Sequence, residues 1–104
     1  MAAAVAGCGS AAPAPSGAVT GTCQEVSAAL SDGPDPSADP VGYAEAQVVP
    51  LRQITTSDAS LRHAIGDLAS AYEQFYSSNA SSEASQAVSQ ASAEVDAICP
   101  GATS

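Results

Sequence analysis

Apolar side chains recur at helical spacing in the stretch Ser57–Tyr76 more clearly than anywhere else in the chain. The steps between them alternate between four and three residues, which places them on one stripe of an α-helix. The members of the stripe are Leu61, Ile65, Leu68, Tyr72 and Phe75. Because most intervening side chains are polar or small, we predict a central helix with one face covered by other helices. Ser57 or Asp58 is placed to cap its first turn.

A second stripe, made mostly of small residues, follows in Ser81–Ile98. Its members are Ala84, Val88, Ala91, Val95 and Ile98, again at steps of four and three. Small side chains allow two helices to approach closely, so we expect this helix to form the main pair with the central one. The Cys99-Pro100-Gly101 sequence ends the helix, and residues 101–104 are expected to fray as a short tail.

Two weaker helical patterns precede the central stretch. Thr20–Ser31 places Cys23, Val26 and Leu30 on one face, with Thr22 as a candidate cap. The next helix is predicted over Pro40–Thr55, and Pro50 is expected to kink or split it. Its inward positions are predicted as Tyr43, Gln47 or Ala46, Val49 or Pro50, and Ile54.

The segment between these two helices contains three prolines and one glycine in Asp32–Pro40, a composition that excludes regular structure. The whole pattern therefore predicts an all-α protein. We expect a small antiparallel bundle of three to four helices, occupying residues 22–100.

Charge excludes several classes of partner. Lys and Arg total 2 against 11 acidic residues, which gives a formal net charge of −9. Nucleic acids and anionic lipid surfaces are bound by clustered Lys and Arg, so neither is expected as an electrostatic partner.

No apolar run reaches the length of about 18–20 residues that is needed to span a bilayer. Because the chain has one Phe and no Trp, its core is small, and small cores are often braced covalently.

The N-terminal segment contains Val5-Ala6-Gly7-Cys8, an aliphatic residue and two small residues before a cysteine. This motif resembles the lipobox of bacterial lipoproteins. The resemblance implies that the Cys8 sulfur takes a diacylglycerol, and that a signal peptidase cuts just before it, which makes residues 1–7 a remnant signal peptide. Residues 8–21 are rich in Ala, Pro, Ser and Gly, a composition typical of a flexible tether with a reach of about 20 Å.

A signal peptide ordinarily also carries a positive n-region and an apolar stretch of about 7–15 residues, neither of which precedes this lipobox. We therefore expect the true start to lie upstream of Met1. The lipobox, the tether and the helical part ending in Ile98-Cys99-Pro100 are similar to the small alanine-rich lipoproteins of actinobacteria, mycobacteria included, whose function is uncharacterised. The resemblance implies a location in the cell envelope and implies no reaction.

Three cysteines are an odd count, which needs an explanation in an exported protein. If Cys8 is acylated, Cys23 and Cys99 remain, near the two ends of the helical region. We predict a disulfide between them, conditional on export. A structural zinc site wants four ligands, and the only Cys and His residues lack metal-type spacing. The alternative to export is a cytoplasmic helical protein with three free thiols.

Other candidates for chemistry are weak. His63 is the single histidine and lies off the central stripe, so we expect a surface position. Asp32, Asp35 and Asp39 do not have the spacing of an EF-hand, and no metal or other cofactor is expected. Tyr43, Tyr72 and Phe75 are candidates for a pocket between the helices, although such residues more often form the margin of a core.

These observations lead to two functional expectations. The first is a non-enzymatic interaction module, held by its acyl anchor on the outer face of the cytoplasmic membrane, which binds another envelope protein. The alternative is a lipoprotein that binds a small molecule or a lipid between its helices. A cavity of about 300 Å³ or more lined by the three aromatic residues would favour this alternative, and a filled interior would favour the first. An enzyme is not expected, because no acid, base and nucleophile converge in the pattern.

Overall fold

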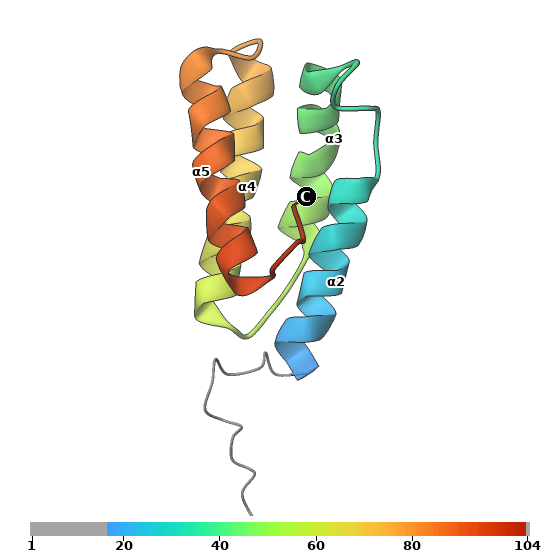
Figure 1. Ribbon diagram of the computed structural model, residues 1–104, viewed down its shortest axis with the longest axis vertical. Coiled ribbons are helices and arrows are strands. Elements are labelled where there is room, and N and C mark those ends of the chain that lie inside the picture. The colour runs from blue at the N-terminus through green and yellow to red at the C-terminus, as the bar shows by residue number, and fades with distance from the viewer. Residues whose placement is uncertain (1–16, 104) are drawn as a thin grey trace, which may run out of the picture.

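A computed structural model describes residues 17–103, in which every regular element is an α-helix. The helices are α2 (Gly17–Ser31), α3 (Pro40–Gln53), α4 (Ala59–Ser77) and α5 (Ser82–Ile98). Figure 1 shows α3, α4 and α5 running side by side, with α2 lying against α3. The predicted all-α class is confirmed. The predicted pairing is incomplete, since α4 packs as extensively against α3 as against α5.

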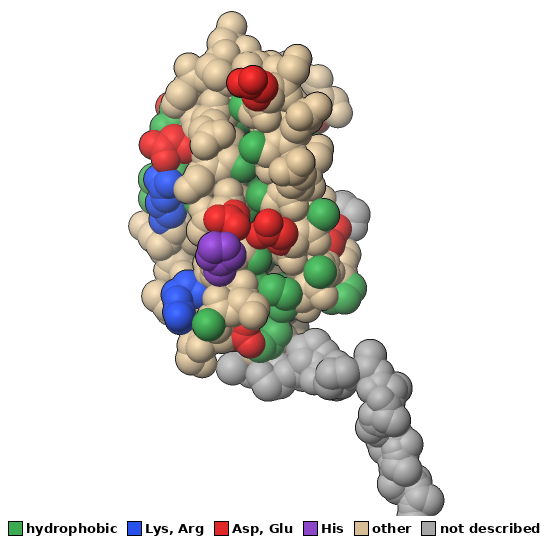
Figure 2. Space-filling view, turned by 90° about the vertical axis from the view of Figure 1, so that its left-hand side faces the viewer, with side chains coloured by type: hydrophobic (Ala, Val, Ile, Leu, Met, Phe, Trp, Pro, Cys, Tyr) green, Lys and Arg blue, Asp and Glu red, His purple; other side chains and the backbone are tan. Residues whose placement is uncertain are grey.

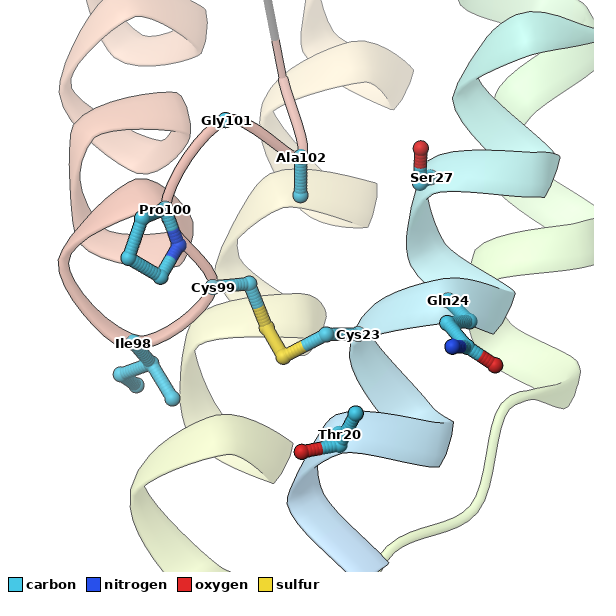
Figure 3. Close-up of a pocket in the computed structure, with 9 residues that line it drawn as sticks. All are labelled: Thr20, Cys23, Gln24, Ser27, Ile98, Cys99, Pro100, Gly101 and Ala102. Carbon is cyan, nitrogen blue, oxygen red and sulfur yellow. A yellow bond between two sulfur atoms is a disulfide. The ribbon is translucent and has the colours of Figure 1, made fainter. Parts of the chain in front are cut away.

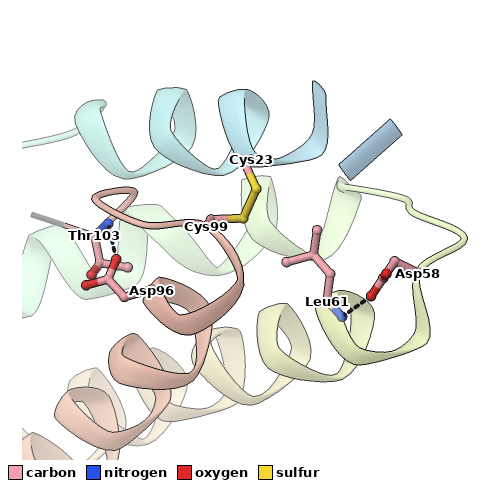
Figure 4. Close-up of a disulfide and its surroundings, with 6 residues drawn as sticks. All are labelled: Cys23, Asp58, Leu61, Asp96, Cys99 and Thr103. Atoms are coloured by element: carbon pink, nitrogen blue, oxygen red, sulfur yellow. Dashed lines mark hydrogen bonds between the residues drawn. A yellow bond between two sulfur atoms is a disulfide. The ribbon is translucent and has the colours of Figure 1, made fainter. Parts of the chain in front are cut away.

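The stripe predicted for α4 forms the centre of the core. Leu61, Ile65, Leu68 and Tyr72 are buried, and Phe75 is half-buried beside them. The first turn is capped by Asp58, whose carboxylate accepts a hydrogen bond of 2.8 Å from the Leu61 amide (Figure 4). From α5, Ala84, Ala91 and Val95 are buried against this face, as the second stripe predicts.

The inward face predicted for helix α3 is correct at Gln47, which is fully buried, and at Tyr43 and Ile54, which pack against the core, but it is wrong at Val49. Val48 and Leu51 are buried, whereas Val49 is 60% exposed. The helix continues through Pro50 to Gln53 instead of splitting, because a proline in the last turn costs only one intrahelical hydrogen bond. Its first turn is capped by Asp39, which accepts from the Gly42 amide at 2.9 Å.

Helix α2 begins at Gly17, earlier than predicted, so Thr22 is a buried helical residue and not a cap. Val19 packs against the core and lies on the same helix face as Cys23 and Val26, which explains why the helix extends toward the N-terminus. The predicted tether over residues 8–21 therefore overlaps α2 from Gly17 onward. None of the helices formed by residues 17–103 is both long enough and apolar enough to cross a membrane.

The C-terminal segment is ordered as far as Thr103, in contrast to the predicted frayed tail. Gly101 adopts a positive φ of 83°, and the Ala102 amide donates to the Cys99 carbonyl at 3.0 Å. The Thr103 amide donates to the Asp96 carboxylate at 3.1 Å (Figure 4). The chain after α5 is therefore folded back onto the last turn of that helix.

One disulfide joins α2 to the end of α5, between Cys23 and Cys99, with the two Cα atoms 5.4 Å apart. The predicted pairing is confirmed. The two cysteines are separated by 76 residues, so the bond closes a long loop. Cross-linking a loop of this length stabilises a fold by about 4 kcal/mol, mainly because it restricts the unfolded chain.

We predict that reduction of this disulfide lowers the melting temperature by about 15–30 °C, since about 4 kcal/mol is lost from a domain of this size. The measurement is thermal unfolding by circular dichroism, with and without a phosphine reductant, in a Cys8→Ser background. The double variant Cys23→Ser/Cys99→Ser should melt at the temperature of the reduced protein. A shift below about 5 °C would show that the bond contributes little.

The turn between α4 and α5 holds two non-glycine residues in left-handed backbone conformations, Asn79 at a φ of 55° and Ala80 at 66°. The Ala80 amide donates to the Phe75 carbonyl at 2.8 Å, and the Asn79 amide donates to the Tyr76 carbonyl at 3.3 Å. This is the hydrogen-bond pattern of a Schellman cap. Asn tolerates the left-handed region, but Ala pays a steric cost of about 1 kcal/mol there.

We predict that Ala80→Gly stabilises the protein by about 1 kcal/mol, because glycine removes the clash at this φ. The matched control is Ala93→Gly at an exposed position inside α5, where glycine should destabilise by about 1 kcal/mol. Urea unfolding midpoints of the two variants should move in opposite directions. Equal losses for both would mean that Ala80 is not strained.

Candidate functional site

The predicted site residues fall into three groups. The lipobox residues Val5, Ala6, Gly7 and Cys8 lie outside the residues that the structure describes. The second group is the disulfide between Cys23 and Cys99. The third group, Tyr43, Tyr72 and Phe75, is brought together from α3 and α4.

The disulfide lies at the bottom of a shallow hollow of about 260 Å³ between α2 and the C-terminal segment (Figure 3). Thr20 and Gln24 line it from α2, and Ile98, Pro100 and Ala102 line it from the opposite side. Cys99 is only 2% exposed, and Cys23 is half-buried. This site braces the fold, and no acid or base faces the sulfur atoms from the lining residues.

The aromatic group lines a second hollow, of about 190 Å³, at the end of the bundle where α3 begins and α4 ends. Pro36, Pro40 and Val88 complete its lining. The rings of Tyr43 and Tyr72 meet edge to face, with centroids 5.9 Å apart and an angle of 78° between their planes. This is a favourable arrangement, because the positive edge of one ring meets the negative face of the other.

The hydroxyl of Tyr43 donates a hydrogen bond to the carbonyl of Leu30, in the last turn of α2. Nearby, the side-chain amide of Gln47 donates to the Asp32 carbonyl at 2.8 Å, while its Oε1 atom is buried without a partner. These two bonds attach the end of α2 to α3. They also fix the Tyr43 ring, so one wall of the hollow is held rigidly in place.

Burial raises the pKa of the Tyr72 hydroxyl far above the usual value, and the neighbouring Tyr43 raises it further. Burial also raises the pKa of Tyr43, although its hydrogen bond with Tyr72 partly opposes the shift. Both phenols are therefore neutral throughout the physiological pH range. The hollow presents apolar rings and uncharged hydroxyl groups.

Sequence reasoning found the three aromatic residues of this hollow and missed the other three. Val88 lies on the predicted α5 stripe, so a helix-packing argument placed it inward without assigning it to a pocket. The sequence pattern indicates only a loop position for Pro36 and only the start of a helix for Pro40. Their positions depend on how the α2–α3 loop folds back toward α4, which a pattern of apolar positions does not encode.

His63 is exposed, and its Nε2 atom lies 3.2 Å from Oδ2 of Asp67, which is one helical turn further along α4. Arg62 donates to the Thr56 carbonyl at 3.2 Å, and Asp58 is the cap of α4. Arg52 of α3 instead pairs with Glu73 of α4 at 2.8 Å, at an exposed position where an ion pair contributes little. Among residues 17–103, no group of three His, Cys, Asp or Glu side chains is placed to hold a metal ion.

The surface is predominantly acidic and uncharged polar. Figure 2 shows a face on which basic side chains and the histidine lie near acidic ones, with hydrophobic side chains exposed among them. The two arginines are the only Lys or Arg residues in the sequence.

Comparisons of the chain with protein-family models, with characterised proteins and with solved structures give no match. Residues 17–103 form an all-helical domain that is closed by a disulfide.

The raised pKa of Tyr72 predicts how stability depends on alkaline pH. In the unfolded chain tyrosine ionises near pH 10, whereas Tyr72 in the folded protein stays protonated above that pH. The unfolded state then binds fewer protons, so the free energy of unfolding falls by about 1.4 kcal/mol per pH unit above pH 10 for this group.

We predict that Tyr72→Phe flattens this decline, with urea midpoints measured between about pH 9 and pH 11. The Cys8→Ser background avoids thiol exchange with the disulfide. Tyr76→Phe removes another phenol, at a half-buried site, and is measured alongside as the matched control. Identical slopes for the Tyr72 variant and the parent would contradict a buried, protonated Tyr72.

Proposed function

We propose that this protein is a lipid-anchored cell-envelope lipoprotein, attached through an acyl group on Cys8 to the outer face of the cytoplasmic membrane. Its helical domain acts as a non-enzymatic interaction module that binds another envelope protein. The Val5-Ala6-Gly7-Cys8 motif supports the anchor, since it has the small residues that precede the modified cysteine of lipoproteins.

The observation that carries the proposal is the way the three cysteines divide. The structure pairs Cys23 with Cys99, and the third cysteine of the sequence, Cys8, is the cysteine of the lipobox-like motif. Disulfides persist in oxidising compartments outside the cytoplasm. The pairing therefore supports export, and a lipobox cysteine is acylated only in a protein that is exported.

The interior of the domain supports an interaction module over a carrier of small molecules. The hollow lined by Tyr43, Tyr72 and Phe75 has a volume of about 190 Å³. Pockets for small-molecule ligands and cofactors usually exceed about 300 Å³. The small aromatic hollow thus favours the first functional expectation over a lipoprotein that carries a small molecule or a lipid.

The test is intact-protein and peptide mass spectrometry of the protein isolated from the membrane fraction of its native host. We expect an N-terminal Cys8 carrying a diacylglyceryl group, and a Cys23–Cys99 peptide pair that is lighter by two hydrogen atoms than the reduced pair. We expect the lipid on Cys8 because only a thiol at this position can form the thioether bond to the diacylglyceryl group.

A Cys8→Ser variant expressed in the same host is the matched control, and it should be absent from the detergent-extracted membrane fraction while retaining its disulfide. An intact Met1 together with three free thiols would contradict both the anchor and the export.

A further inference from the structure

We infer that the hollow formed by Pro36, Pro40, Tyr43, Tyr72, Phe75 and Val88 is a docking site for one bulky apolar side chain from a cationic segment of a partner protein. The inference rests on the proposed function as an interaction module and identifies the surface that performs it. Four observations carry it, namely the size, the rigidity, the charge and the position of the hollow.

The volume of about 190 Å³ matches a single side chain. An apolar cavity of about 150 Å³ in another protein accommodates a benzene molecule, so this hollow has room for one aromatic or branched aliphatic group. Protein interfaces obtain most of their binding energy from such buried anchors, inserted into small preformed pockets.

The walls of the hollow are held in place before any partner arrives. Tyr43 is fixed by its bond to the Leu30 carbonyl and by the edge-to-face contact with Tyr72. The two prolines have restricted backbones, and the Asp39 cap on Gly42 holds the start of α3 next to Pro40. A pre-organised pocket loses little conformational entropy on binding, which favours affinity from a small contact area.

The charge around the hollow selects a cationic partner. Between residues 32 and 51 the chain contains Asp32, Asp35, Asp39 and Glu45 and no Lys or Arg. Arg62 lies ten residues before Tyr72 on α4, about 15 Å along the helix axis. Arg52 is paired with Glu73, the residue after Tyr72, at 2.8 Å, so its charge is offset locally. The carboxylates of residues 32–51 therefore dominate the charge beside the start of α3 and attract an approaching Lys or Arg.

The position of the hollow leaves it accessible on an anchored protein. Pro36 of its lining belongs to the loop that follows α2, and Pro40 is the first residue of α3, whereas the chain enters α2 at Gly17, the opposite end of a helix of 15 residues (Figure 1). This helix is about 22 Å long. An anchor at Cys8 would therefore attach the domain at the end of α2 remote from the hollow.

The test is selection of a phage-displayed library of random dodecapeptides on the oxidised full chain carrying Cys8→Ser. We expect enriched peptides to contain one bulky apolar residue flanked by Lys or Arg. The synthetic peptide of the most enriched sequence should perturb the amide resonances of Tyr43, Tyr72 and Val88 in ¹⁵N-labelled protein. Its affinity should fall about tenfold or more between about 0.1 M and 1 M NaCl, as the Debye length shrinks from about 10 to 3 Å.

Three variants assign the binding to the hollow. Val88→Phe fills it and should weaken the peptide about tenfold or more, which is the usual effect of losing a central anchor contact. Ala93→Phe adds the same ring at an exposed position of α5 and should leave affinity unchanged. Asp32→Asn/Asp35→Asn removes two charges while keeping both side-chain shapes, and should weaken binding and reduce its salt dependence. Circular dichroism melting of each variant checks that it is folded.

The inference is overturned if no peptide is enriched, if the enriched peptides lack basic residues, or if their binding survives Val88→Phe. It is also overturned if toluene or a short-chain alcohol shifts the same resonances while no peptide does, since the hollow would then be a small-molecule site. None of these experiments requires the acyl group. An acylated protein that selects no peptide therefore refutes the docking surface alone, and an unacylated protein that selects cationic peptides refutes the envelope location alone.

Discussion

The bond between Cys23 and Cys99 is the constraint on which the arrangement of the helices depends. Helices α3, α4 and α5 share the long apolar stripe of α4, whereas α2 makes far fewer contacts with the rest of the molecule. Among the α2 side chains from Val19 to Ser31, only Val26 is completely buried. A helix with so little apolar contact would be poorly retained by packing alone, because each fully buried aliphatic side chain contributes only about 1.5–3 kcal/mol. The covalent link holds it by restricting the unfolded chain.

The other end of α2 is held by polar contacts. Tyr43 and Gln47, one turn apart on α3, donate to the carbonyl groups of Leu30 and Asp32. Helix α2 is thus attached at its middle by a disulfide and at its end by two hydrogen bonds, with Val26 between them. The same Tyr43 that makes one of these bonds also forms a wall of the aromatic hollow. Stability of the α2 end and shape of the proposed docking surface therefore depend on one side chain.

This arrangement is consistent with a protein that presents a rigid surface at a distance from a membrane. The proposed anchor precedes α2, and the aromatic hollow lies beyond the opposite end of that helix. Net negative charge keeps a small domain soluble and discourages self-association, while an uncharged aromatic hollow with acidic neighbours gives a defined place for a cationic partner.

The sequence alone determined the helical class and the buried face of α4, because apolar periodicity is a local property of the chain. It also determined which two cysteines pair, because assigning Cys8 to the lipobox leaves one possible pair. It also identified Tyr43, Tyr72 and Phe75, since aromatic residues are few in this chain. Only the tertiary structure decided that Val48 and Leu51, and not Val49, face inward on α3, because the phase of a weakly amphipathic helix is set by its neighbours. The start of α2 at Gly17 and the placement of Pro36, Pro40 and Val88 around one hollow were likewise decided by packing. Contacts between residues far apart in the chain depend on how loops return to the core, and a periodic pattern carries no information about that path.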